Sequence, residues 1–155
     1  MALEVGRLYR YREAGGRLDV GFSDGAIPLL RTRLQMEPDH VESLYNLGMV
    51  YSDRMRLKQA RELLGRAVEL DPGDANAQVA QGIAALRDND PEAAQSPLEK
   101  AVLLEPRNPD ARRSLGQLLL MQADPAAALP HLRAGIDLAR EYELARGMVG
   151  GESAR

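Results

Sequence analysis

A phrase that recurs at a fixed interval constrains the fold of this chain more than any other feature. Residues 67–75 read AVELDPGDA, and residues 101–109 read AVLLEPRNP. Pro38, Pro72 and Pro106 stand at equal intervals along the chain. Self-similarity with a period of about 34 residues is typical of proteins in which one small unit of secondary structure is repeated and stacked on its neighbours. The sequence therefore predicts a repeat architecture.

Small and apolar residues recur with the same period as the prolines. The three columns are Gly48, Gly82 and Gly116; Ala60, Ala94 and Ala128; and Leu64, Leu98 and Leu132. Small side chains on two helices joined by a turn allow the helix axes to approach closely, and leucine fills the space between them. Proline cannot continue a helix, so it ends each unit. We therefore expect each repeat to be a helical hairpin in which the glycine of the first helix lies close to the alanine of the second.

Two helix starts are marked by the pair Asp-Pro. Asp90 and Asp124 are expected to cap helices that begin at Pro91 and Pro125. An aspartate side chain can accept hydrogen bonds from the free backbone N–H groups of the first turn. Proline is favoured at the first helical position because its fixed φ suits a helix and its missing N–H is not needed there.

The repeat resembles the tetratricopeptide repeat, whose signature is L-G-x-x-Y, then A-x-x-x-F, then P, over about 34 residues. The residues that carry the resemblance are NLGMVY at 46–51, followed by Ala60, Leu64 and Pro72. Consecutive copies are read at residues 41–74, 75–108 and 109–146. The resemblance implies an all-α fold, a right-handed α-solenoid of about four antiparallel helix pairs.

A first copy is expected at about residues 1–40, with an insertion. VGRLY at 5–9 aligns with the signature, but the alanine that the register places at position 18 arrives only as Ala26. Residues 15–22 are therefore interpreted as an inserted loop. A simple loop extension is the favoured interpretation, and a loop that contacts a partner is the alternative.

The C-terminal copy is expected to end in one long helix. Arg140 stands where a closing proline would fall, and no helix breaker occurs before Gly147. We expect a helix from about Pro125 to Arg146 that ends near Gly147. The predicted repeat domain is 1–147, and 148–155 is predicted to be a flexible tail.

Composition narrows the possible functions. The 155 residues are 45% hydrophobic and 28% charged, with a net charge of −3 and no block of like charge, so a nucleic-acid partner is not expected. Cysteine is absent, and no stretch approaches the length of about 18 apolar residues that a membrane span needs. A cytoplasmic location is the prediction, with no membrane association.

Catalysis is not expected from the residues present. His40 and His131 are the two histidines, and neither begins a metal-binding H-x-x-x-H pattern. The glycine-rich MVGGES at 148–153 closes a helix instead of opening one, so it lacks the geometry of a phosphate-binding loop. No enzyme activity, cofactor or metal is therefore predicted.

In the tetratricopeptide family the first helix of each repeat lines a concave groove that binds peptides. The resemblance implies that the groove positions of this chain are Tyr45, Met49, Val79, Ile83, Leu86, Arg87, Arg113, Gln117, Leu120 and Met121. Further positions are Asp53 and Asn76 and, in the first copy, Leu3, Arg7, Arg10 and Tyr11. One subclass of the family binds a C-terminal carboxylate through Asn and Lys, but Tyr45, Met49, Val79 and Ile83 occupy the corresponding positions here. An apolar or amphipathic peptide is the expected ligand.

The third repeat suggests an apolar groove. Gln78, Gln81 and Ala85 stand at positions expected to face inward and are poor core residues. Val79, Ile83 and Leu86 instead form an apolar stripe spaced i, i+4 and i+7. We interpret this stripe as turned toward the groove. The alternative is that it is core between neighbouring repeats.

Three functions remain open from the sequence. The favoured one is a protein-interaction module or adaptor that binds a partner peptide or helix in its groove. The alternative is a scaffold that forms homo-oligomers through its terminal repeats, for which Ile136, Leu138, Tyr142 and Leu144 are candidate contacts. A catalytic or nucleic-acid role within the 15–22 insertion is much weaker.

Overall fold

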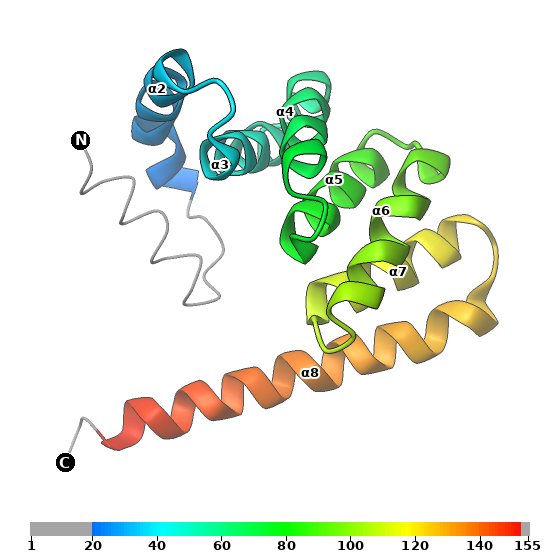
Figure 1. Cartoon of the computed structure of the whole chain (residues 1–155). Coiled ribbons are helices and arrows are strands. Elements are labelled where there is room, and N and C mark those ends of the chain that lie inside the picture. Colours follow the sequence, from blue (N-terminus) through cyan, green and yellow to red (C-terminus); the bar gives the residue numbers. More distant parts are fainter. Residues whose placement is uncertain (1–19, 153–155) are drawn as a thin grey trace. The chain divides into compact units, whose positions relative to one another are not determined.

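The computed structural model describes residues 20–152, with side chains described from residue 25 to residue 147. Within this part of the chain every regular element is a helix (Figure 1). The helices are α2 (Val20–Met36), α3 (Val41–Asp53), α4 (Leu57–Leu70), α5 (Ala75–Arg87), α6 (Pro91–Leu104), α7 (Pro109–Met121) and α8 (Pro125–Glu152). The helix predicted at the start of the first copy lies outside the described residues.

Two compact units divide the chain, Met1–Pro72 and Gly73–Arg155. In the first unit α2 packs on α3, and α3 packs on α4. Leu30 of α2 and Leu64 of α4 are fully buried. Arg66 of α4 forms an ion pair with Asp39 at 2.8 Å. Asp39 lies in the turn between α2 and α3, so this ion pair links α4 to the turn that precedes its repeat.

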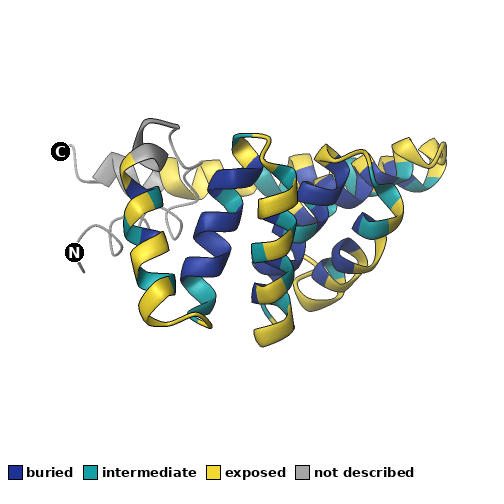
Figure 2. Ribbon diagram, turned by 90° about the horizontal axis from the view of Figure 1, so that it is seen from above, coloured by how far each residue is buried: buried dark blue, intermediate teal, exposed yellow. Residues whose placement is uncertain are grey.

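The second unit contains two helical hairpins, α5–α6 and α7–α8, and α7 packs on both helices of the first hairpin. Its main core cluster draws side chains from α5, α6 and α7. The buried members are Ala85, Leu86, Ala94, Leu98, Leu115 and Leu118. Figure 2 shows α3 buried along most of its length, whereas buried and exposed residues alternate along α4, as expected for a helix that buries one stripe.

The glycine column packs closely against the leucine column. A Cβ atom added to Gly48 would lie 2.6 Å from Cγ of Leu64, and one added to Gly116 would lie 2.6 Å from Cγ of Leu132. Gly82 meets Leu98 in the same way. At Gly116 the carbonyl oxygen of Ala128 also lies 3.3 Å from the added Cβ. The leucines therefore occupy the space that the glycines leave, and the alanines of the repeat, Ala60, Ala94 and Ala128, are fully buried.

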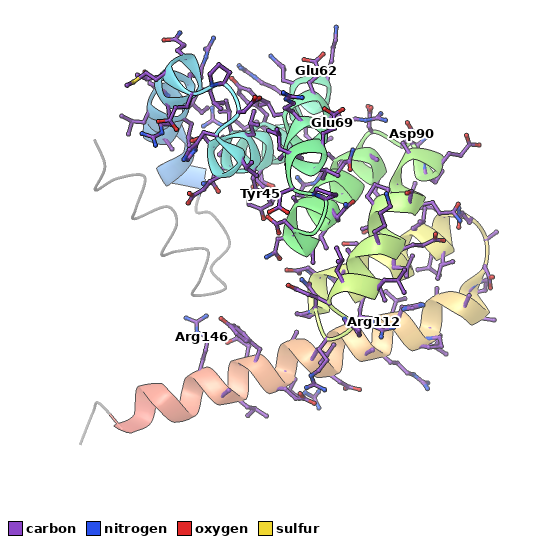
Figure 3. All side chains as sticks on the ribbon, in the orientation of Figure 1. Tyr45, Glu62, Glu69, Asp90, Arg112 and Arg146 are labelled. Atoms are coloured by element: carbon purple, nitrogen blue, oxygen red, sulfur yellow. The ribbon has the colours of Figure 1, made fainter. Side chains whose placement is uncertain are left out.

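The predicted caps are confirmed at both Asp-Pro sites. The Asp90 carboxylate accepts a hydrogen bond from the N–H of Ala93 at 3.0 Å, at the start of α6 (Figure 3). Asp124 accepts one from the N–H of Ala127 at 3.0 Å, at the start of α8. Arg56 holds the equivalent position before α4 and makes no side-chain cap. Aspartate caps therefore recur in the third and fourth repeats and are missing from the second.

The turns inside the hairpins share one backbone feature. Met55, Asn89 and Ala123 have positive φ angles of 58°, 55° and 60°. They recur at the same interval as the prolines, so they are equivalent positions of successive repeats. This left-handed conformation favours glycine or asparagine, because a Cβ atom is otherwise crowded by the backbone. The repeat therefore carries a strained turn residue in at least two copies, at Met55 and Ala123.

Two predicted boundaries were wrong. Helix α8 does not end at Gly147 but continues to Glu152, so the first residues of the predicted tail are helical. Glycine costs only about 1 kcal/mol within a helix, so without a proline or a cap it did not stop this one. The predicted insertion, 15–22, lies partly outside the described residues, and its last three residues are not loop, because they form the first turn of α2.

Candidate peptide-binding surface

The predicted apolar stripe of α5 is largely core. Val79 and Leu86 are buried, with 5% and 7% of their surface exposed, and Ile83 is half-buried. Val79 clusters with Ala101 of α6 and Ala111 of α7, with Ile83 packed against them. Leu86 belongs to the cluster that α7 completes. The alternative interpretation, packing between neighbouring repeats, describes these side chains.

The expectation that Gln78 and Ala85 are poor core residues was wrong. Gln81 is half-buried, whereas Gln78 is only 1% exposed and Ala85 is also buried. The repeat register places both positions inward whatever residue occupies them, because the helix is held by its hairpin partner and by α7. A polar side chain was therefore carried into the core by its position.

On α7 the predicted groove positions are at the surface. Arg113, Gln117, Leu120 and Met121 are exposed, and Leu120 shows half of its surface, at 50%. Arg113 pairs with Asp110 one turn earlier on the same helix. At the end of α5, Arg87 is exposed as well. In the second unit, these five side chains are the predicted groove residues that a ligand could reach most directly.

The remaining predicted positions are mostly covered. Tyr45 is buried and Met49 half-buried on α3, in the first unit, where Asp53 is exposed. In the second unit, Asn76 accepts a hydrogen bond from the side-chain amide of Asn108 at 3.4 Å, which links α5 to the cap of α7. The predicted positions in the first copy lie outside the described residues.

Each histidine makes a polar contact with a residue of a helix. Nδ1 of His40 lies 3.2 Å from the backbone N of Ser43 and caps α3. Arg112 of α7 lies 3.1 Å from Nδ1 of His131 on α8 and donates to the carbonyl of Pro106 at 2.9 Å (Figure 3). Partial burial, and then the positive charge of Arg112, lower the pKa of His131 below its usual value.

The described residues include no group of three or more potential metal ligands. Across the same part of the chain, none of the helices combines the length and apolar character that crossing a membrane requires.

One exposed apolar region was only partly anticipated. Ile136, expected as a terminal contact, is 61% exposed on α8, and Leu129, two turns earlier on that helix, is also exposed. Leu132 was assigned only to the hairpin core, yet it is half-buried. The available signal was the repeat register, because among the described residues the fourth copy has no following helix like the one that covers the third.

The sequence and fold define a class of repeat protein. Two tetratricopeptide repeat models match the chain, one over residues 23–82 and the other over residues 79–143. The chain belongs to the tetratricopeptide repeat family, and its fold is an all-α solenoid.

Solved structures of MamA proteins are among those similar to this chain. A crystal structure of MamA has 30% sequence identity and a TM-score of 0.69, and the match covers 76% of this chain and 69% of that one. MamA from Desulfovibrio magneticus RS-1, from residue 41 to its end, has 25% identity and a TM-score of 0.70, with 84% and 74% covered. A comparison with curated proteins found no match. The repeats and these relatives support a protein-interaction scaffold as the class of function.

Proposed function

We propose that this protein is a non-catalytic adaptor that binds a partner peptide or helix along the exposed side of α7. The observation that carries the proposal is the contrast between two helices. The predicted groove positions of α5 are largely used in packing, whereas Arg113, Gln117, Leu120 and Met121 of α7 are all exposed.

These α7 side chains suit an amphipathic ligand. Burying Leu120 and Met121 under a ligand would contribute about 1.5–3 kcal/mol each before the costs of ordering. Gln117 can donate and accept hydrogen bonds at the edge of the contact, and Arg87 and Arg113 supply positive charge. The ligand is therefore an apolar stretch with polar or acidic neighbours.

Quantitative capture from the source organism tests the proposal, with Met121→Lys compared with wild type. A lysine in the last turn suits the helix dipole, so the fold should be retained while the apolar contact is lost. Leu103→Lys is the matched control, because Leu103 is 80% exposed on α6 and belongs to no predicted binding surface. We expect Met121→Lys to deplete the partner at least about tenfold, which corresponds to about 1.4 kcal/mol. Equal capture by the two variants would reject the α7 surface.

A self-assembling scaffold is the second candidate function. Ile136, Tyr142 and Leu144 of α8 are exposed apolar side chains, which favours a contact between copies, while Leu138 is half-buried. Light scattering at two protein concentrations separates the candidates, since a scaffold of this kind increases in mass with concentration. The cytoplasmic location stays a prediction.

A further inference from the structure

A second surface follows from comparing equivalent positions of the third and fourth repeats. Three pairs of residues, each separated by one repeat, differ in burial. They are Leu86 and Leu120, Leu98 and Leu132, and Val102 and Ile136. The first member of each pair is buried or partly buried against the core cluster, and the second is exposed or only half-buried. We call Leu120, Leu129, Leu132 and Ile136 the end face.

Helix α7 covers these positions in the third repeat. Leu115 and Leu118 complete the cluster of Leu86 and Leu98, and Ala111 packs on Ala101. The covering helix therefore presents a small residue and two leucines at spacing i, i+4 and i+7. A helix with this face fits the end face, because the underlying positions keep their apolar character.

The end face of the fourth repeat differs in charge, along its edge, from the surface of the third repeat that α7 covers. Glu99 of α6 is replaced by Arg133 at the equivalent position of α8, and Arg140 lies two turns further along that helix. Both arginines are three or four residues from Ile136 and thus share its side of α8. The exposed Asp137 lies beside both, four residues after Arg133 and three before Arg140, so this edge keeps a net positive charge. Both arginines are exposed, and neither makes an ion pair with another described residue.

This charge pattern disfavours a second copy of α8 as the occupant. Pairing two α8 helices through Ile136 would place Arg133 against Arg140 of the other copy if antiparallel, or each arginine against itself if parallel. Like charges at such distances destabilise the contact. A helix with acidic residues beside its apolar stripe is attracted instead.

We propose that the end face docks an amphipathic helix of a partner protein, with the α7-like pattern Ala-x-x-x-Leu-x-x-Leu and acidic flanking residues. The site extends the stacking interface that α7 makes in the third repeat. It shares Leu120 with the proposed adaptor surface but goes beyond that surface, because it is centred on Ile136 of α8 and does not include Met121.

Two synthetic peptides of about 16 residues, held helical by an internal cross-link, test the proposal, since unconstrained helices of this length are marginal. Both carry the Ala-x-x-x-Leu-x-x-Leu face, and one has glutamates and the other arginines at the flanking positions. Fluorescence anisotropy against the whole chain measures the binding of each. We expect the acidic peptide to bind at least about tenfold more tightly than the basic one, and the difference to shrink as salt rises.

Substitutions in this chain test whether the peptide binds at the end face. Ile136→Glu should weaken binding of the acidic peptide at least about tenfold, because a carboxylate would be buried in an apolar contact. Leu103→Glu is the control and should not change peptide binding. Leu103 lies on α6, outside the end face, and its equivalent one repeat later, Asp137, is not an end-face residue. The double change Arg133→Glu and Arg140→Glu should reverse the charge preference. Met121→Lys should have no effect, so the two proposals can fail separately.

Three results would overturn the inference: neither peptide binds, Ile136→Glu binds as wild type does, or the chain self-associates through Ile136 without binding either peptide. The last result would assign the end face to a second copy. Circular dichroism of Ile136→Glu checks that folding is retained, as the exposure of Ile136 leads us to expect.

Discussion

The third and fourth repeats place equivalent residues in different surroundings. Leu86 at the end of α5 is 7% exposed, and its equivalent in α7, Leu120, is 50% exposed. Val102 packs against the core clusters, whereas Ile136 is 61% exposed. The local hairpin is the same in both repeats, with a glycine under a leucine and an aspartate cap. What differs is the following helix, which covers the third repeat and has no counterpart over the fourth among the described residues.

This comparison shows that burial in a stacked repeat depends on the neighbour as much as on the residue. Stability in such proteins is roughly the sum of terms within each repeat and terms between neighbours. A substitution in the third repeat should therefore weaken packing within the repeat and packing against the following helix. The equivalent substitution in the fourth repeat should weaken only the packing within the repeat.

The largest expected difference concerns the leucine column. Leu98→Ala should lower the free energy of unfolding by about 2–5 kcal/mol, because Leu98 is fully buried and its removal leaves a cavity. Leu132→Ala should cost about half as much, since Leu132 is already half-buried. Urea unfolding of both variants measures the two losses. Equal losses would mean that the fourth repeat is as well covered as the third.

The glycine column should show a smaller difference in the same direction. Gly82→Val should cost about 1–3 kcal/mol, because the new side chain overlaps Leu98, which has no free space to enter. At Gly116 the overlap is with Leu132, which can move toward solvent, so Gly116→Val should cost less. Thermal unfolding of the pair gives the ranking, and a larger loss at Gly116 would contradict it.

The hairpin turns offer a gain of stability. Ala123→Gly should stabilise the protein by about 1 kcal/mol, because Ala123 has a φ of 60° that glycine adopts without strain. Asn89→Gly, at the equivalent turn of the third repeat, should change stability little, since asparagine tolerates this conformation. Chemical denaturation of both variants provides the comparison. A similar gain at both turns would show that strain in the alanine turn is not the cause.

The smallest expected effect depends on pH. The pKa of His131 is lowered in the folded state, so the unfolded chain binds this proton more readily. Stability from this group is complete above about pH 6.5, the ordinary pKa, and is lost as the pH falls toward the lower folded value. The equivalent residue of the third repeat is Pro97, which does not titrate. His131→Gln should flatten the pH dependence of unfolding in this window, and an unchanged slope would remove His131 as the cause.

Much of the fold could be predicted from the sequence, because the constraints are local and repeated. The Asp-Pro pairs mark the starts of α6 and α8, and the glycine and leucine columns indicate the hairpin. The end of α8 could not be predicted, since Gly147 is a weak helix breaker without a cap or contact around it.

The candidate site was harder to predict than the fold. A stripe such as Val79, Ile83 and Leu86 has the same spacing whether a ligand or the next repeat covers it. Gln78 shows the converse, because its buried position is fixed by the register and not by its polarity. Which apolar residues stay uncovered depends on packing between helices distant in sequence, and that information is not in the local pattern.

Thiol labelling tests the central claim most directly, because the chain has no cysteine of its own. Single variants Leu86→Cys and Leu120→Cys place one thiol at equivalent positions of the third and fourth repeats. If the neighbouring helix decides burial, Leu120→Cys should react at close to the rate of a free thiol, and Leu86→Cys at least about a hundredfold more slowly, since its reaction requires local opening. Equal rates at the two positions would contradict the account.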